Sequence, residues 1–304
     1  MATRPLKLPS SYALCVSQSE RLVAAIGRNV VIANLQSRQR LSSTQPVSHP
    51  SRVDFSSDDK LLVVKSTWGE IAVLDAANGE KLTSYRPKRQ DEGAEIRFAP
   101  EGDLLVDGSW TGEIRVRPAA SPSAFESFAF DGELINSVSR NRDGDLWLFG
   151  HTTKYNAAVA EAPRPYVSLW KWPLRAPQST INVGLKILDE ASLAPTAPYI
   201  AVVGYCANDK SKVLRILSID GELLASTKLE LGGTGSSTRW SPDSKLIGTI
   251  MKGRFVVYAA PALTPYATYE EEYPADLAIL SSGSEIILGS WSAGRIANLA
   301  PSDA

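Results

Sequence analysis

The sequence of 304 residues contains only two cysteines, Cys15 and Cys206, which lie far apart in unrelated contexts. Two thiols cannot build a disulfide framework, and no Cys-x-x-Cys or His/Cys cluster indicates a zinc site. No apolar run approaches the length of about 18 residues that spans a bilayer. The N-terminal stretch MATRPLKLPSSYALC lacks the apolar core of a secretory signal. We therefore expect no membrane association and a cytoplasmic location.

A surplus of positive charge is also missing, because 32 Lys and Arg residues face 33 Asp and Glu residues. Binding to the phosphate backbone of a nucleic acid requires a concentrated basic surface. The charge balance therefore argues against a nucleic-acid partner.

The chain contains few residues or motifs from which a catalytic site could be built. The only histidines, His49 and His151, lie in expected turns far apart in sequence, which disfavours a metal cluster or a Ser-His-Asp triad. The stretch LGGTGSS at 231–237 is glycine-rich but matches neither a phosphate-binding loop nor a dinucleotide fingerprint. We expect no catalytic residue, no metal and no cofactor.

What the chain does have is an internal repeat. Short apolar runs such as KLLVVKS, DLLVDGS and EIILGS each end at a polar turn that carries tryptophan. Turns of this type recur roughly every forty residues, which is the period of four-stranded propeller blades. The residues that mark the turns are Arg28, Trp68, Trp110, His151, Tyr205, Lys252 and Trp291.

Each unit repeats one order of elements. An alternating strand such as RVDFSS or EIRFAP precedes a polar turn, and a nearly all-apolar second strand follows. A third strand such as EIAVLDA comes after the marked turn, and a weaker fourth strand closes most units. Second strands that are apolar on both faces are typical of strands buried on both sides. The pattern predicts an all-β protein with seven four-stranded blades.

The stretches RVDFSSDDKLLVVKSTWGEIAVLDAANGEKL and TRWSPDSKLIGTI resemble units of the WD-repeat β-propeller family. The resemblance covers nearly the whole chain but is degenerate. In this respect the chain resembles stand-alone bacterial WD-like proteins. The family's Gly-His and Trp-Asp dipeptides are mostly missing, and Trp, Gly, His or Tyr replaces its turn aspartate. The chain is therefore expected to lack the family's buried hydrogen-bond tetrad and to hold its blades by apolar packing.

The resemblance also implies how the ring closes. In WD-repeat propellers an N-terminal strand completes the last blade, whose own strands are LAILSS, EIILGS and RIANLA here. The segment RPLKLP at 4–9 would supply this strand, with Leu6 and Leu8 locking the ring and hiding a sheet edge. We expect one domain over 1–304 that is a monomer.

Charged residues occupy one register of the first strands, which line the central channel of a propeller. Just before the aromatic or equivalent position stand Asp54, Arg97, Glu190 and Arg239. Buried charges must be paired, so we expect ion pairs between neighbouring blades: Asp54 with Arg97, and Glu190 with Arg239. The functional alternative is a channel-mouth site for a polar ligand or for an arginine-seeking peptide.

The marked turns all join second to third strands, so the resemblance places them on one face around one channel mouth. Tryptophan, tyrosine and arginine dominate binding hot spots. The marked turn of the fourth unit is extended by a long loop insertion at 151–166, and long loops are often functional. The candidate partner-binding residues are Arg28, Trp68, Trp110, His151, Tyr155, Tyr205, Lys252 and Trp291.

Three interpretations of this face remain open: a copied tryptophan that only covers its own hairpin, a partner-binding surface, and a platform for sugars or other ligands. The preferred hypothesis is a non-enzymatic protein-interaction module, acting as a scaffold or as a neutraliser of a partner protein. The alternative is a propeller enzyme or ligand-binding protein of lactonase or glycan type, with its site at the channel mouth. That alternative needs convergent carboxylates or histidines, for which Asp54 and Glu190 are the inward-facing candidates.

Overall fold

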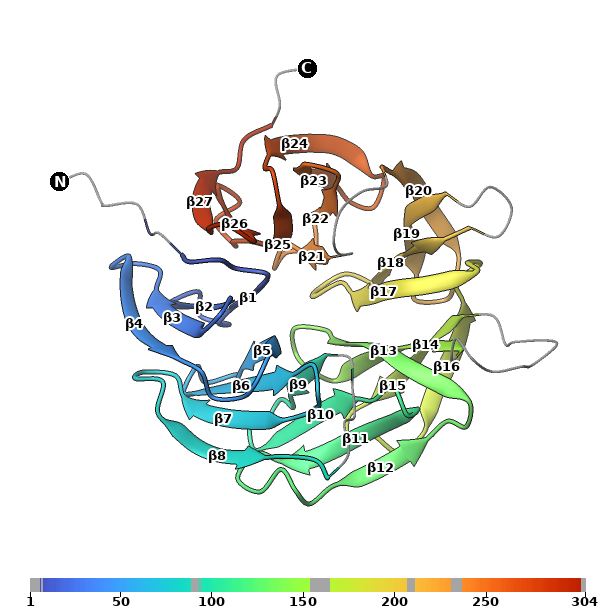
Figure 1. Ribbon diagram of the computed structural model, residues 1–304. Helices are drawn as coiled ribbons and strands as arrows, with labels where there is room; N and C mark the ends of the chain where they lie inside the picture. Colours follow the sequence, from blue (N-terminus) through green and yellow to red (C-terminus); the bar gives the residue numbers. More distant parts are fainter. Residues whose placement is uncertain are drawn as a thin grey trace.

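The computed structural model describes residues 6, 8–88, 93, 95–153, 165–206, 211–230 and 237–301. These residues form seven antiparallel sheets and no helix, and the sheets are arranged as blades around a central channel (Figure 1). In every blade the strands are hydrogen-bonded in sequence order, with the first strand innermost. The predicted seven-bladed all-β propeller is confirmed.

The first three blades have four strands each. Their bounds are β1 (Ala13–Val16), β2 (Leu22–Ile26), β3 (Val30–Asn34), β4 (Gln39–Thr44); β5 (Pro50–Phe55), β6 (Leu61–Ser66), β7 (Ile71–Asp75), β8 (Lys81–Tyr85); β9 (Ile96–Phe98), β10 (Leu104–Gly108), β11 (Glu113–Pro118) and β12 (Glu126–Ala129).

Blades four to six also have four strands, and blade seven has three among the described residues. Their bounds are β13 (Glu133–Arg140), β14 (Leu146–Thr153), β15 (Tyr166–Lys171), β16 (Pro177–Asn182); β17 (Ile187–Leu193), β18 (Tyr199–Tyr205), β19 (Lys212–Ser218), β20 (Leu223–Leu229); β21 (Thr238–Trp240), β22 (Leu246–Met251), β23 (Arg254–Ala259), β24 (Thr264–Glu270); β25 (Pro274–Ile279), β26 (Glu285–Ser290) and β27 (Arg295–Asn298).

The second strands carry the core because both of their faces meet a neighbouring blade. The central residues of β2, β6 and β18 are completely buried. Each pair of adjacent blades shares one apolar cluster, including the pair formed by blades seven and one. Apolar packing between blades is therefore the main source of stability, as the all-apolar second strands predict.

The turns between first and second strands repeat one local design. Ser56 Oγ accepts a hydrogen bond from Leu61 N at 2.9 Å and donates to Asp58 at 2.7 Å. In blade six Ser241 Oγ accepts from Leu246 N at 2.9 Å and donates to Asp243 at 2.6 Å. The hydroxyl satisfies the backbone where the strand ends, which explains the serine that follows the inner strand in both sequences.

The ring closes through the N-terminal segment. Leu8 forms an antiparallel bridge with Gly294, and the two N–H···O distances are 3.2 and 3.0 Å. Leu6 and Leu8 are 5% and 2% exposed and pack into the cluster between blades seven and one. The predicted contact of these leucines with the last blade is confirmed. Pairing by residues 1–5 and 7 lies outside the described residues.

Candidate functional site

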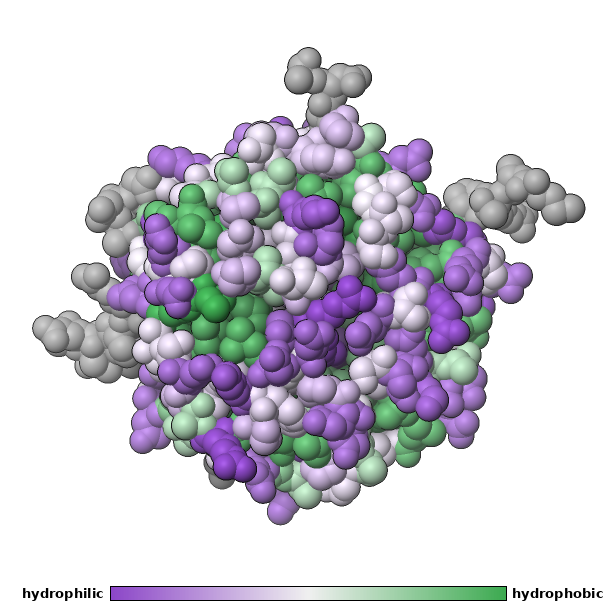
Figure 2. All heavy atoms as spheres, turned by 180° about the vertical axis from the view of Figure 1, so that it is seen from behind, coloured by the Kyte–Doolittle hydropathy of each residue, from purple (hydrophilic) through white to green (hydrophobic). Residues whose placement is uncertain are grey.

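The two ends of the ring differ in which turns they carry. We call the end with the turns between second and third strands, where Trp68, Trp110 and Trp291 lie, the tryptophan face; the opposite end is the far face. Inner strands begin at the tryptophan face and end at the far face. The channel holds a cavity of about 390 Å³ at the tryptophan face and one of about 510 Å³ at the far face. Hydrophilic side chains surround the central hollow in the view of Figure 2.

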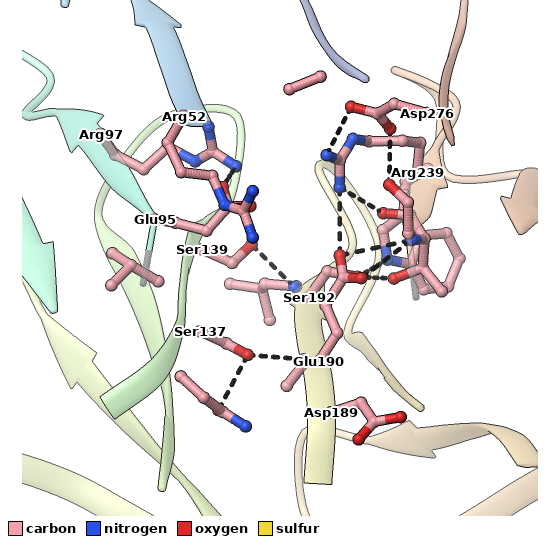
Figure 3. A pocket seen from close by; sticks show the side chains of 18 of the residues that line it. Arg52, Glu95, Arg97, Ser137, Ser139, Asp189, Glu190, Ser192, Arg239 and Asp276 are labelled. Atoms are coloured by element: carbon pink, nitrogen blue, oxygen red, sulfur yellow. Dashed lines mark hydrogen bonds and ion pairs between the residues drawn. The ribbon is translucent and has the colours of Figure 1, made fainter. Parts of the chain in front are cut away.

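One charge cluster lies between blades two and three. Arg97 Nη2 forms an ion pair with Glu95 Oε2, and Arg97 Nη1 lies 3.7 Å from Asp54 Oδ1. Asp54 Oδ2 accepts a hydrogen bond of 2.8 Å from the backbone N of Phe98 in the next blade. Arg52 Nε lies 3.4 Å from Glu95 Oε1 on the channel side (Figure 3).

A second cluster joins blades five, six and seven. Arg239 Nη1 lies 3.1 Å from Glu190 Oε1, and Arg239 Nη2 lies 3.0 Å from Asp276 Oδ2 (Figure 3). Asp276 also accepts hydrogen bonds from Ser237 Oγ at 2.6 Å and from Leu14 N of blade one at 2.8 Å. Both predicted ion pairs, Asp54 with Arg97 and Glu190 with Arg239, are present.

The carboxylates of the two clusters differ in pKa. Burial acts to raise the pKa of Glu95, but the neighbouring Arg97 and Arg52 outweigh it and lower the pKa to about 2. Burial raises the pKa of Asp54 above its usual range despite the nearby Arg97. Burial also raises the pKa of Glu190 to about 7, against the opposing charge of Arg239.

Between the two clusters, blade four contributes hydroxyls. Ser137 Oγ accepts a hydrogen bond of 2.9 Å from Ala191 N, and Ser139 Oγ accepts one of 3.0 Å from Leu193 N. Side chains of one inner strand thus satisfy backbone N–H groups of the next inner strand at several steps around the ring. The channel polar groups hold neighbouring blades in register.

On the tryptophan face the exposed aromatic residues are few. Trp110 and Trp291 are 46% and 49% exposed, whereas Trp147, Trp170 and Trp240 are buried. Trp291 stacks on Tyr12 with ring centroids 4.9 Å apart, and both residues line the cavity at this mouth.

The other candidates on this face are placed differently. Trp68 is half-buried, with its ring centroid 4.5 Å from that of His49. Tyr205 is half-buried at the end of β18, and Arg28 and Lys252 are exposed on their turns. Tyr155 and most of the 151–166 insertion lie outside the described residues.

The placement of His151 on an exposed turn is wrong. His151 lies inside β14, which continues to Thr153, and its side chain is completely buried. Its Nδ1 lies 2.8 Å from Glu133 Oε2, and its Nε2 lies 2.7 Å from Ser168 Oγ, which accepts a 2.8 Å hydrogen bond from Trp170 Nε1. Blade four thus contains a buried four-residue hydrogen-bond chain.

Apolar packing alone therefore does not hold every blade. Besides the chain of blade four, an almost fully buried set of ion pairs joins blades two and three: Lys65 Nζ lies 3.0 Å from Asp107 Oδ2, and Arg117 Nε lies 2.6 Å from Asp107 Oδ1. Buried charges of this kind are tolerated because each is paired.

The order Glu133, His151, Ser168 is that of an acid-base-nucleophile triad, but its position does not suit that chemistry. Ser168 is 1% exposed, and neither channel cavity is lined by it. Its hydroxyl is hydrogen-bonded to His151 Nε2 and accepts from Trp170 Nε1, so its hydrogen bonds are made inside the blade. A nucleophile must reach its substrate. The hydrogen-bond chain from Glu133 to Trp170 is therefore part of the core of blade four.

Several residues of the site were missed by the sequence analysis. Arg52, Glu95 and Asp276 complete the channel clusters. Tyr12 stacks on Trp291, and Tyr273 O accepts a hydrogen bond of 3.1 Å from the backbone N of Trp291. Tyr273 is 54% exposed. Alternation along the inner strands predicts Glu95, which stands two residues before Arg97; no repeat of the marked turns predicts Tyr12 or Tyr273.

Across the described residues, no group of three His, Cys, Asp or Glu side chains could hold a metal ion. In the same residues no helix is long and apolar enough to cross a membrane.

No protein-family model matches the sequence, and no curated protein matches it. Solved structures resemble it in fold. The β-propeller domain of Cps50 (Swd1) from Myceliophteria thermophila has a TM-score of 0.76 at 10% identity, covering 97% of this chain and 98% of that one. The hydrazine synthase of Kuenenia stuttgartiensis also has a TM-score of 0.76, at 12% identity, with 97% of each chain covered. These similarities show the propeller fold.

Proposed function

We propose that this propeller is a non-enzymatic cytoplasmic protein that binds a partner protein through its tryptophan face, as a scaffold or as a neutraliser of that partner. The observation that carries the proposal is the exposure of Trp110 and Trp291, the most exposed tryptophans of the chain, on turns of the same face. Large aromatic side chains left in water on one face are typical of binding hot spots.

The aromatic surface around Trp291 supports this proposal. Tyr12 stacks under the indole, and the exposed Tyr273 lies beside it in the same blade region. A ring that is already held by a stacking partner loses little rotamer freedom when a partner protein covers it. The region therefore offers a preorganised apolar contact next to the polar channel mouth.

The state of the channel carboxylates favours binding over catalysis in the channel. Asp54 and Glu190, the candidates for an acid-base pair, each accept a backbone N–H of the next blade and face an arginine. These groups serve the joints between blades. The structural similarity to the Swd1 propeller is compatible with a scaffold. The enzyme alternative would need a channel carboxylate or histidine that is not used in contacts between blades.

The test is a comparison of partner capture by the wild-type chain and by the variant Trp110→Ala/Trp291→Ala. Tagged proteins are incubated with a lysate of the native host, and retained proteins are identified and then titrated. Each lost hot-spot indole should weaken binding by about 2 kcal/mol or more, so the double variant should lose the partner. Its melting temperature should stay close to that of the wild type, because both indoles are exposed.

The matched control is Leu82→Ala/Leu223→Ala, which removes two equally exposed apolar side chains from outer strands. This control should retain the partner. Equal capture by the tryptophan variant and the wild type would refute the proposed face. Unfolding of the tryptophan variant would show that the two indoles stabilise the fold.

A further inference from the structure

The far-face cavity is lined by the ends of inner strands and by the turns that follow them. Its volume is about 510 Å³, within the range of small-molecule sites. Three arginines, Arg97, Arg140 and Arg142, line it together with two carboxylates, Asp54 and Glu20. Arg97 belongs to the channel cluster described above and has its carboxylate partners there. The role of Arg140 and Arg142 in this cavity is still to be explained.

The carboxylates at this mouth are already satisfied by donors of the protein. Glu20 accepts hydrogen bonds of 2.6 Å from both the backbone N and the hydroxyl of Ser281. Asp54 accepts from Phe98 N at 2.8 Å and faces Arg97. Burial also raises the pKa of Asp54.

Arg140 and Arg142 form no close ion pair with a carboxylate among the residues that the structure describes, although the positive charge of Arg140 is near enough to Asp54 to act against the rise of its pKa. Arg140 Nη1 donates one long hydrogen bond of 3.5 Å to the carbonyl of Arg142. Arg140 Nε is buried and has no hydrogen-bond acceptor among the described residues, as is also true of Arg215 Nε and Arg254 Nε. Because a buried guanidinium N–H without an acceptor is costly, an oxyanion that reaches Arg140 would be stabilised.

The end of β13, with Arg140, and the following turn, with Arg142, are fixed before any ligand arrives. Asn141 Oδ1 accepts hydrogen bonds from Gly144 N at 2.9 Å and from Leu146 N at 3.2 Å. The backbone N of Arg142 donates to Pro195 O of blade five at 2.8 Å. Because the backbone is held on both sides, the free-energy cost of ordering the protein on binding would come mainly from the side chains.

We propose that the far-face cavity binds a small molecule bearing an oxyanion, phosphate or carboxylate, through Arg140 and Arg142. Guanidinium groups bind such oxyanions through paired, charge-assisted hydrogen bonds. The cavity is also lined by the apolar residues Phe55, Trp240 and Ile279, which suit an organic portion attached to the oxyanion. This site is on the face opposite the proposed partner surface and does not depend on it.

The experiment is isothermal titration calorimetry of the full chain with inorganic phosphate and with phenyl phosphate, at constant ionic strength set by chloride. The variant Arg140→Gln/Arg142→Gln removes both charges and leaves shorter, neutral side chains that can still form hydrogen bonds. The control is Arg175→Gln, an exposed arginine that lines neither cavity. Thermal unfolding of each protein shows that it is folded, and the single variant Arg142→Gln, on the exposed turn, replaces the double variant if that one does not fold.

Saturable binding of either probe, weakened at least about tenfold in the double variant and unchanged in the control, is the expected result. Tighter binding of phenyl phosphate identifies an organic oxyanion as the natural class, and equal binding identifies the free anion. Absence of saturable binding by both probes, or equal affinity of the double variant and the wild type, overturns the proposal.

Discussion

Arg97 and Arg239 occupy the same position in their blades, one residue before the aromatic residue of the inner strand, but their carboxylate partners come from different places. Arg97 pairs most closely with Glu95 of its own blade and reaches Asp54 of blade two only at 3.7 Å. Arg239 bridges Glu190 of blade five and Asp276 of blade seven at 3.1 and 3.0 Å. One arginine is satisfied mainly within its blade, and the other ties three blades together.

This difference teaches that a repeated register does not imply a repeated role. Asp276 extends the second cluster further, because it also accepts from Leu14 N and so links the last blade to the first. The second cluster should therefore carry more of the stability of the closed ring than the first.

The strongest test of that difference is Asp276→Ala. The substitution leaves Arg239 without its closest partner and removes the acceptor for Leu14 N and Ser237 Oγ. Breaking a buried charge network in this way should cost about 3–5 kcal/mol in the free energy of unfolding. Chemical denaturation measures it, with Asp243→Ala as the control because that carboxylate is half exposed on a turn. A loss no larger than that of the control would contradict the linking role.

A pH titration of stability distinguishes Glu190 from Glu95. The pKa of Glu190 is about 7 in the folded chain against 4.5 as its ordinary value, so the folded state binds the extra proton between these values. Stability from this group is complete below pH 4.5 and falls as pH rises toward 7, by about 3 kcal/mol at most.

The variant Glu190→Gln should lack this decline while keeping an acceptor for Thr238 N. Denaturation curves of both proteins between pH 4.5 and 8 measure the difference. The titration of Glu95, whose pKa lies near 2, falls below this window and is common to both proteins. Parallel pH profiles of the variant and the wild type would show that Glu190 ionises normally.

The smallest effect is expected for the pair Asp54 and Arg97. Because Arg97 keeps Glu95 when Asp54 is removed, a double-mutant cycle of Asp54→Ala and Arg97→Ala should give a coupling energy of about 1 kcal/mol. The corresponding cycle of Asp276→Ala and Arg239→Ala should give a larger coupling. Equal coupling energies in the two cycles would mean that the geometry of the bridges does not decide their strength.

The blade pattern and the channel pairs could be predicted from the sequence because both depend on short-range periodicity. Apolar second strands recur at blade period, and the charged register of the inner strands places Asp54 beside Arg97 and Glu190 beside Arg239 in neighbouring blades. Asp276 was not found because the inner strand of blade seven was expected to begin at Leu277, whereas it begins three residues earlier, at Pro274.

His151 shows why the rest could not be predicted. Its unit was aligned on the tight turns of the other blades, but β14 extends past that position, so His151 became a core residue. Its partners Glu133 and Ser168 lie on the neighbouring strands, 18 and 17 residues away, and no local spacing connects them. Arg140 ends β13 and Arg142 stands in the turn that follows, and their neighbours in the far-face cavity come from other blades.

The hydrogen bond from Leu14 N to Asp276 joins residues that are 262 positions apart in the chain. At a synthesis rate of about 5–20 residues per second, a ribosome takes roughly ten seconds to a minute to travel between them. During that time the inner strand of blade one exists without the carboxylate it will contact. The ring can therefore close only after blade seven has been synthesised. Blade one is made first, and its contact with blade seven is the last contact between neighbouring blades to become possible.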